Sequence, residues 1–431
     1  MHRVLIITYY WPPNGGAGVY RWLKFSKYLP QNGWQPVIYT PQDPELVSHD
    51  PDVSKDIAQE VEVVRQPITE PFSLYKRFTG RKQEERVQTA FLNEGGKRGW
   101  KDDVALWIRS NLFIPDARVW WVKPSIKFLT NYLKEHPVDA IITTGPPHSM
   151  HLIGLGLKRA TGIKWVADFR DPWTDIDYYG QLTLTKWADK KQHRLEREVL
   201  QAADKVVTVS WSWAKDLEQL GGRPVEVITN GYDPADVPNP SASMDDAYSL
   251  VHIGSMVATR DCPELWNTLG ELVRTDGEFA DRFVLRFVGP VDLSVIESAT
   301  SAGLGEHIER MGRVGHAEAM REMQRARVLL LPINDTPNSM GILPGKVFEY
   351  LSVGRPILAV GPKEGDIARV LGLDHLLISR TGAKRELERI KALFATPMQG
   401  HQNQATNQFS RPSLANEVAE LLQRTFTAQN H

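Results

Sequence analysis

Short apolar runs alternate with longer amphipathic stretches along most of the chain. This alternation is typical of βαβ units, which build parallel sheets. In the first half, the predicted strands are Val4–Ile7, Pro36–Tyr39, Ala140–Thr143, Trp165–Ala167, Val206–Val209 and Val225–Ile228. Helical periodicity predicts helices at Val19–Leu29, Met150–Arg159, Lys186–Ala202 and Trp213–Leu220.

The alternation stops at residues 233–246, which are rich in Pro, Ser and Asp and show no periodicity, as expected for an interdomain linker. It then restarts, with strands predicted at Leu250–Ile253, Val284–Val288, Ile308–Met311, Val328–Leu331, Ile357–Val360 and Leu376–Ile378. Helices are predicted at Pro263–Arg274, Ala317–Arg325, Lys346–Leu351, Arg385–Phe394 and Pro412–Thr425.

The pattern therefore predicts an α/β protein of two doubly wound, Rossmann-like domains that face each other across a cleft. The first domain spans residues 1–232, with a C-terminal helix in 409–431 packing back on it, and the second spans 247–408. In such sheets, ligands bind beyond the carboxyl ends of the strands, so functional residues are expected directly after strands.

Composition and charge narrow the classes of function. A formal net charge of −1 gives no overall field that would favour nucleic acid. Cys262 is the only cysteine, which excludes an internal disulfide and fits a reducing compartment. No run approaches the ~20 apolar residues that span a bilayer. We therefore expect a cytoplasmic protein.

The segment Asn338–Gly361 carries the strongest chemical signal. A loop of small residues, including Gly341 and Gly345, runs into an amphipathic helix. Small residues before a helix let backbone N–H groups approach an anion, and the helix dipole favours negative charge there. Lys346 and Glu349, three residues apart, share a helix face, where one meets a phosphate and the other a sugar hydroxyl. The alternative is an ordinary helix start with a surface ion pair.

Two further strand-to-helix turns suit a phosphorylated ligand. Gly15 and Gly16 follow the first strand and let the backbone approach a ligand closely, although such turns also need glycine for structure alone. Arg260 follows the first strand of the second domain, beyond the Gly254 turn. Its guanidinium is suited to a diphosphate, and a solvated loop arginine is the alternative.

In the first domain, candidate catalytic residues also follow strands. His148 lies in the turn after Ala140–Thr143, where a substrate contact and a packing role are both open. Asp171 lies in an acidic segment after Trp165–Ala167, which suits polar recognition or acid–base chemistry. Arg170 in the same segment either has such a role or pairs with Asp168 or Asp171 to fix the turn.

No metal site is predicted. His148 and His151 are spaced as two ligands, but neither a cysteine nor an acid stands nearby in the sequence to complete the site. Asp175 and Asp177 form a D-x-D, a loose pattern that we interpret as a loop feature.

In the order of these motifs the chain resembles GT-B-fold glycosyltransferases of the retaining family four, in their bacterial polysaccharide and glycolipid branch. The resemblance spans nearly the whole chain. It is carried by the N-terminal glycine turn, residues 230–233 (N-G-Y-D), the Gly254 turn, residues 312–314 (G-R-V) and the 338–361 block.

The resemblance implies roles for individual residues. Glu349 resembles the second acid of the family's E-x7-E motif, which holds the nucleotide ribose. Arg260 and Lys346 match the basic pair on the donor diphosphate, His148 the histidine near the donor sugar, and Val314 the main-chain contact with the base. The other implied donor-binding residues are Gly15, Gly16, Gly341 and Ile342.

One position departs from the family. The first acid of E-x7-E falls at position 341, where this chain has Gly341. In the family this acid contacts the transferred sugar, so the resemblance implies a variant active site. No cofactor or metal is implied, since the nucleoside-diphosphate sugar is the donor substrate.

Residues 72–123 are the least similar to the family. Basic and aromatic side chains interleave there, which suits peripheral contact with anionic lipid at the inner face of the cell membrane. Packing of these aromatics on the domain is the alternative.

The expected function is transfer of a sugar, with retention, from a nucleoside-diphosphate sugar to a glycan, lipid-linked or small-molecule acceptor. The catalytic candidates are His148 and Asp171. A sugar-nucleotide epimerase of the same fold and a catalytically lapsed nucleotide-sugar-binding protein are the alternatives. The base, the sugar, the acceptor and the oligomeric state are not specified by these motifs.

Overall fold

The computed structural model describes residues 1–44, 51–68, 100–238, 242–372, 375–395 and 404–427. The chain divides into two compact units, residues 1–229 with 414–431 and residues 230–413. The second unit is thus inserted between the body of the first and its last helix. Each unit is described separately below.

The first unit is built on a parallel sheet with the strand order β3-β2-β1-β4-β5-β6-β7 among the described residues. This is the doubly wound order, in which the chain moves outward from β1 and then resumes on its other side at β4. The strands are β1 (His2–Ile7), β2 (Trp34–Pro41), β3 (Glu62–Gln66), β4 (Ala140–Gly145), β5 (Lys164–Phe169), β6 (Lys205–Thr208) and β7 (Glu226–Val227).

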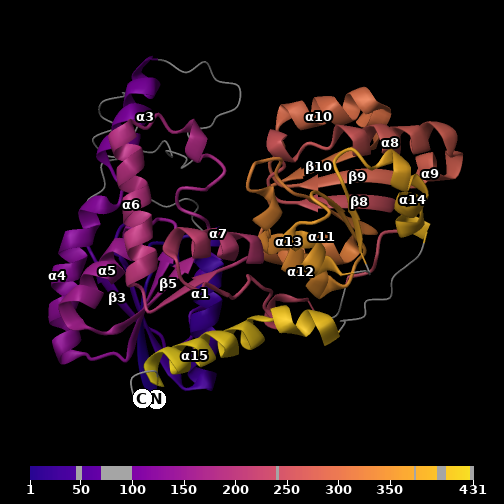
Figure 1. Cartoon of the computed structure of the whole chain (residues 1–431). Coiled ribbons are helices and arrows are strands. Elements are labelled where there is room, and N and C mark those ends of the chain that lie inside the picture. Colours follow the sequence, from indigo (N-terminus) through magenta and orange to yellow (C-terminus); the bar gives the residue numbers. More distant parts are fainter. Residues whose placement is uncertain (45–50, 69–99, 239–241, 373–374, 396–403, 428–431) are drawn as a thin grey trace. The chain divides into compact units, whose positions relative to one another are not determined.

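Helices cover both faces of this sheet (Figure 1). They are α1 (Ala17–Tyr28), α4 (Val119–Glu135), α5 (Ser149–Thr161), α6 (Lys186–Ala202), α7 (Trp211–Gly221) and α15 (Arg411–Thr427), whereas α3 (Trp100–Leu112) packs against α6. Alternate strand residues point to opposite faces. Leu5 and Ile7 therefore join a core with α4 to α7, whereas Val4 and Ile6 join a core with α1 and α15.

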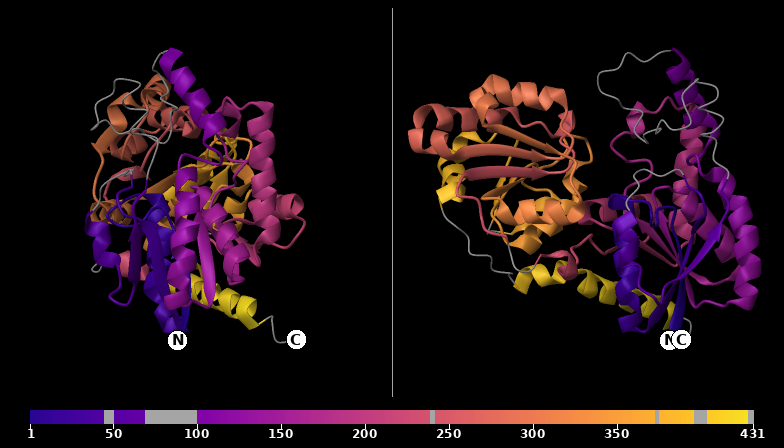
Figure 2. Two further views of the ribbon diagram at one scale, coloured as in Figure 1. Left: turned by 90° about the vertical axis from the view of Figure 1, so that its left-hand side faces the viewer. Right: turned by 180° about the vertical axis from the view of Figure 1, so that it is seen from behind.

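The last helix, α15, completes the second of these cores. Leu414, Val418, Leu421 and Leu422 are buried against α1 and the sheet. The ring of Phe426 lies 5.1 Å from that of His2, so the end of α15 adjoins the start of β1 (Figure 2).

The second unit has a parallel sheet in the same doubly wound order, β10-β9-β8-β11-β12-β13 within the described residues. Its strands are β8 (Tyr248–Ile253), β9 (Phe283–Val288), β10 (Ile308–Gly312), β11 (Val328–Pro332), β12 (Ile357–Val360) and β13 (Leu376–Ile378). Its helices are α8 (Pro263–Thr275), α9 (Gly277–Arg282), α10 (Leu293–Ala299), α11 (His316–Arg325), α12 (Gly345–Val353), α13 (Asp366–Leu371) and α14 (Leu387–Ala395).

Helices again lie on both faces, with α8, α9 and α10 on one side and α11, α12 and α13 on the other (Figure 1). The α/β prediction of two Rossmann-like sheets is confirmed, and every predicted strand overlaps an observed one. The edge strand β3 and the helices α3 and α4 are additions that the sequence pattern did not single out. In β3, Glu62 and Arg65 are exposed, so it lacks the continuous apolar run of a buried strand.

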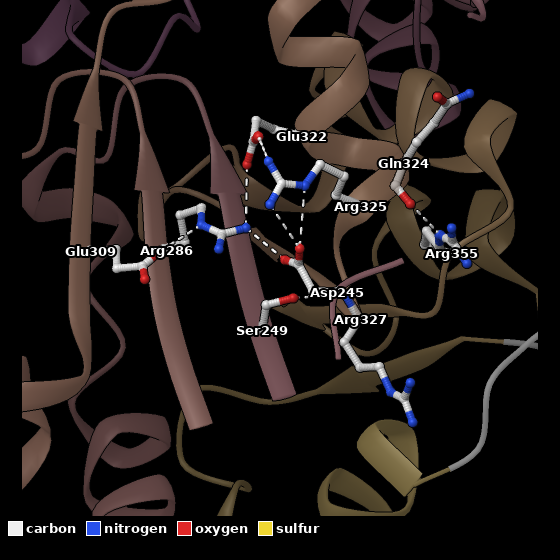
Figure 3. Close-up of polar contacts among 9 residues, drawn as sticks. All are labelled: Asp245, Ser249, Arg286, Glu309, Glu322, Gln324, Arg325, Arg327 and Arg355. Carbon is white, nitrogen blue, oxygen red and sulfur yellow. Dashed lines mark hydrogen bonds and ion pairs between the residues drawn. The ribbon is translucent and has the colours of Figure 1, made fainter. Parts of the chain in front are cut away.

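The segment 233–246, expected as an interdomain linker, is held by the second unit at its described end. It belongs to the second unit, and its Asp245 is 9% exposed at the side chain. Asp245 lies 2.7 Å from the Arg286 guanidinium of β9 and 3.1 Å from that of Arg325 in α11, while Glu322 contacts both arginines (Figure 3). The segment before β8 is therefore anchored by a network of charged side chains.

Candidate active site

In the first unit, the switch in strand order lies between β1 and β4, the place where doubly wound sheets bind ligands. The Gly15–Gly16 turn follows β1 and the His148 turn follows β4, so both stand at this crevice. Gly16 has φ 96°, a conformation that favours glycine, and precedes α1.

Arg170, which follows β5, ties these two turns together. Its Nη1 donates to the carbonyl of Gly18 at 3.0 Å, and its Nη2 donates to the carbonyl of Pro146. Its backbone N–H donates to Gly145 at 3.0 Å. Arg170 therefore positions the crevice through main-chain carbonyls.

The alternative in which Arg170 pairs with Asp168 is not observed. Asp168 is buried and pairs instead with Arg21 of α1 at 3.0 Å. It also accepts hydrogen bonds from Trp22 at 2.7 Å and Thr144 at 2.9 Å. Arg21 has no sequence signal for this role, because its partner lies 147 positions away. Asp168 thus joins α1 to β4 and β5 from within.

The two candidate catalytic residues differ in their surroundings. His148 is 8% exposed and stacks on Trp173 with ring centroids 4.8 Å apart. Burial, followed by the nearby His151 and Arg170, lowers its pKa well below the usual value, so the ring is neutral. Asp171 is half-buried, and burial raises the pKa of its carboxyl group against the opposing effect of Arg170.

In the second unit, the switch in strand order lies between β8 and β11. Gly254 follows β8 with φ 102°, and the 334–344 loop follows β11 and leads into α12. Lys346, in the first turn of α12, extends its Nζ over Gly254, where a Cβ atom would lie 2.2 Å from it. Glycine at 254 therefore makes room for the ammonium group at the crevice.

Lys346 and Glu349 are charged groups that the protein leaves without close partners. Neither side chain makes a hydrogen bond or an ion pair with any residue in the described part of the chain. Burial lowers the pKa of Lys346 and raises that of Glu349, and their mutual attraction opposes both shifts. Because burying charged groups without partners costs free energy, their retention indicates a ligand that pairs with them.

The start of α12 adds to this arrangement. Its N-cap is Pro344, which provides no side-chain hydrogen bond, and its first turn contains no acid. The positive end of the helix is therefore available to an anion beside Lys346.

Arg260 is held in place on the other side of Gly254. Its Nε donates to Asn334 at 2.7 Å and its Nη1 to the carbonyl of Ser255 at 2.8 Å. It is half-buried, so it is not the solvated loop arginine of the alternative interpretation. Sequence reasoning missed Asn334, although its place directly after β11 was a usable signal.

Glu349 lies in a field of charges that the sequence does not reveal. His316, Lys346 and Arg411 lower the pKa of its carboxyl group, whereas Asp236 raises it. These residues come from α11, α12, the start of α15 and the segment before β8. Their sequence separation explains why no motif contains them.

The remaining predicted contacts are backbone positions. Gly341 is buried at the end of a single 3-10 turn, Ser339–Gly341, and Ile342 follows it half-buried. Val314 is half-buried in the loop after β10, beyond Gly312 with φ 66°. Gly254, Gly289, Val314 and Asn334 thus follow four neighbouring strands at one sheet edge.

The described residues contain no group of three or more His, Cys, Asp or Glu side chains arranged to hold a metal ion. Within the same part of the chain, no helix combines the length and apolar character needed to cross a membrane.

Comparison with known proteins agrees with this architecture. Residues 83–236 match the family model described as Glycosyltransferase Family 4. No curated protein matches the chain in sequence.

Solved structures match over nearly the whole chain. A glycosyltransferase from Rickettsia africae has a TM-score of 0.64 at 13% identity, with 99% of each chain covered. WaaG, a glycosyltransferase involved in lipopolysaccharide biosynthesis, has a TM-score of 0.54 at 13% identity, covering 97% of this chain and 99% of its own. A UDP-N-acetylglucosamine 2-epimerase, so described for Listeria monocytogenes, has a TM-score of 0.54 at 12% identity, covering 99% and 97%. At these identities the likeness establishes the fold.

Proposed function

We propose that the chain is a glycosyltransferase of the GT-B fold, in which residues 83–236 match the model of Glycosyltransferase Family 4, and that it uses a nucleoside-diphosphate sugar as donor. The acceptor is a glycan, a lipid-linked sugar or a small molecule, and the reaction proceeds with retention. The observation that carries the donor class is the pair of unpartnered charges, Lys346 and Glu349, on the first turns of α12.

Each part of the donor has a counterpart in the second unit. Lys346, Arg260 and the N-terminus of α12 stabilise the diphosphate, and so compensate the charge that develops on the leaving group. Glu349 accepts hydrogen bonds from the ribose hydroxyls. The turn at Val314 contacts the base, and the loop at Gly341 and Ile342 adjoins the sugar.

In the first unit, His148 donates a hydrogen bond to the transferred sugar, because a neutral imidazole is a donor through one nitrogen. Asp171 orients the acceptor hydroxyl, and its half-buried carboxylate is suited to accept that proton. The Gly15–Gly16 turn gives the diphosphate a close backbone surface.

The absence of an acid at Gly341 bears on the sugar half of the donor. No side chain at this position reaches the sugar, so His148 and backbone groups carry more of its recognition than in the family at large. The lapsed-protein alternative predicts nucleotide binding without turnover.

A donor screen followed by a transfer assay tests the proposal. The chain is scanned for thermal stabilisation by nucleoside diphosphates and their sugars, since a ligand that binds the folded state raises stability. The stabilising donor is then incubated with glycan and lipid-linked acceptors. We expect stabilisation by a diphosphate and its sugar, and acceptor-dependent release of the nucleoside diphosphate. No stabilisation by any of them would refute the site.

A sugar-nucleotide epimerase remains the alternative function, because a solved structure described as a UDP-N-acetylglucosamine 2-epimerase has the same fold. An epimerase converts the donor without an acceptor. A product assay with donor alone therefore separates the two activities.

We also propose that the first unit contacts anionic membrane at the inner face of the cell. The predicted segment 72–123 lies partly outside the described residues. In its described part, Trp107 and Trp120 are 45% and 46% exposed, which is unusual for tryptophan. Trp187 of α6 is 63% exposed, with Lys190 and Lys191 three and four positions on, as in interfacial helices.

The side chain of Asn111 joins the end of α3 to the segment that leads into α6. Asn111 donates to the carbonyl of Thr183 at 2.8 Å and accepts from the backbone N–H of Thr185 at 2.7 Å. Leu112, 64% exposed, and Trp187 are therefore neighbours of one junction between α3 and α6.

Co-sedimentation with anionic vesicles at low salt tests this contact. We expect binding that weakens in Trp187→Ser and Lys190→Glu, and that is unchanged in Lys134→Glu, at the far end of α4. Absence of binding by the unaltered chain at low salt would exclude the membrane contact.

A further inference from the structure

Two histidine nitrogens in the first unit are buried without hydrogen-bond partners, Nδ1 of His148 and Nε2 of His151. Both face the same place. They are the atoms nearest to the missing side chain of Gly145, where a Cβ atom would lie 2.9 Å from the first and 2.6 Å from the second. Such groups are rare in buried positions, so their convergence calls for an explanation.

The other nitrogen of His151 fixes which of its atoms carries the proton. Trp165 donates its indole N–H to the hydroxyl of Thr143 at 2.9 Å, and that hydroxyl lies 2.8 Å from Nδ1 of His151. An indole nitrogen only donates, so the hydroxyl accepts from Trp165 and has one hydrogen left. Donating it to Nδ1 of His151 satisfies all three groups. The proton of His151 is then on Nε2.

This proton decides the state of His148. Nδ1 of His148 and Nε2 of His151 do not hydrogen-bond each other, but both lie beside the same point, the place of the missing Cβ atom of Gly145. An N–H on each of them would bring two positive ends close together. A bare Nδ1 presents a lone pair instead, which places the His148 proton on Nε2. A second proton is disfavoured for the same reason, and the neighbouring Arg170 adds to this.

Stacking prevents either ring from turning away. His148 lies flat on Trp173, with 9° between the ring planes, and His151 lies on Phe169 with 16° between planes and 4.4 Å between centroids. Thr143, His151 and Trp165 are all buried. The arrangement is therefore built into the core beneath the crevice.

We propose that Thr143 and His151 are positioning residues for His148. The chain Trp165 to Thr143 to His151 keeps His148 neutral with its proton on Nε2, so that it acts as a hydrogen-bond donor and not as a general acid or base. In the protein alone, the backbone carbonyl of Pro172 is the acceptor beside that donor. The inference rests on the proposed function only for the hydroxyl of the sugar substrate that takes its place.

The test is histidine nitrogen NMR on the full chain labelled with ¹⁵N-histidine, without substrate. Each ring nitrogen reports whether it carries a proton, and His148→Asn and His151→Asn assign the signals. We expect Nε2–H and bare Nδ1 for both histidines at neutral pH. A protonated Nδ1 on His148 in the unaltered chain would overturn the proposal.

Variants at Thr143 test whether its hydroxyl sets the proton positions on His151 and His148. Thr143→Val removes the hydroxyl, so Nδ1 of His151 loses its donor and the signals of both rings shift. Thr143→Ser restores them. Thr161→Val removes a hydroxyl that bonds only the α5 backbone and nearby N–H of Ile163, and leaves both rings unchanged. Unchanged ring signals in Thr143→Val would also overturn the proposal.

Activity separates this inference from the proposed function. Thr143→Val is expected to lower kcat by about 3- to 10-fold, the value of one misdirected hydrogen bond, and Thr143→Ser to restore it. If the NMR result holds but His148→Asn transfers sugar at the normal rate, Thr143 and His151 still set the state of His148, and the role of His148 in transfer fails.

Discussion

At the scale of the residue, the second unit leaves Lys346 and Glu349 without close protein partners. A structural ion pair would bring the two groups together, since they share a face of α12. They interact only at longer range, and burial disfavours both charges. A ligand that carries a phosphate and hydroxyl groups relieves both costs.

Replacing either side chain is therefore expected to weaken donor binding. Lys346→Ala and Glu349→Ala each lose charged hydrogen bonds and cost about 1–3 kcal/mol of binding free energy. Calorimetric titration with the donor found in the screen measures this. Lys363→Ala, which removes an exposed ion pair with Glu386, is the matched control and leaves affinity unchanged. Normal affinity in both site variants would refute the assignment.

Gly254→Ala addresses the same site through the backbone. With φ 102°, alanine costs about 1–2 kcal/mol of stability, and its Cβ displaces the Lys346 ammonium. Donor affinity is expected to fall by about 1–3 kcal/mol. Gly33→Ala, where φ is 81° and no atom lies within 4 Å of the added Cβ, is the control: it also costs stability and leaves affinity unchanged. Equal affinity in the two variants would show that Gly254 does not serve Lys346.

The buried His252 gives a pH dependence of stability. Burial lowers its pKa from 6.5 to about 4 in the folded protein. Between these values the unfolded chain binds a proton that the folded chain does not. Stability therefore falls as pH falls from 6.5 to about 4, by about 1.4 kcal/mol per pH unit from this group.

His252→Asn keeps a donor near Nδ1, which contacts the Leu330 carbonyl at 3.1 Å, and removes the titrating ring. Urea unfolding at several pH values should show a shallower loss of stability in this variant. Parallel curves for the variant and the unaltered chain would contradict the assignment.

Sequence reasoning placed the candidate residues by one rule, that functional groups follow parallel strands. The rule located His148, Arg260 and Lys346 at the two switch points. It missed Asn334, and it did not identify Arg21 as the partner of Asp168. The groups around Glu349 come from four distant segments, and the tautomers of His148 and His151 depend on Thr143 and Trp165. Such information lies in tertiary packing and not in spacing.

At the scale of the element, apolar runs and helical periodicity predicted the strands of both sheets except β3. That strand lies at an edge, where one side needs no partner and polar residues are tolerated. The network around Asp245 was also missed, because a segment rich in Pro, Ser and Asp has the composition of a free linker.

The network around Arg286 is expected to stabilise the second unit. Arg286→Met leaves Asp245 and Glu322 buried with less compensation, although Arg325 still contacts both. The expected loss is about 3 kcal/mol, the lower end of the range for a broken buried pair. Urea unfolding measures it. Arg321→Met breaks an exposed pair on α11 and should cost less than about 0.5 kcal/mol. Equal effects in the two variants would contradict the anchoring role.

At the scale of the whole molecule, the chain leaves its first unit at Thr229 and returns to it at Leu414. The sequence predicted that a C-terminal helix packs on the first unit. The buried face of α15 contributes apolar side chains to the core of that unit. Four aliphatic side chains, Leu414, Val418, Leu421 and Leu422, are removed from water. At about 1.5–3 kcal/mol each, they rival the whole stability of a typical domain.

Leu421→Ala is expected to destabilise the first unit alone, by about 2–5 kcal/mol. Hydrogen exchange should show lost protection in β1 and α1, with β8 to β13 unchanged. Glu420→Ala, on the exposed face of the same helix, is the control. Loss of protection in both units would show that they unfold together.

The late return of α15 has a consequence during synthesis. The first 229 residues emerge from the ribosome with one face of their sheet covered only in part, by α1, and the helix that completes this core follows about 200 residues later. At about 5–20 residues per second, that face waits roughly 10–40 s for its helix. A stalled or truncated product therefore exposes apolar surface to chaperones and proteases, whatever the state of the second unit.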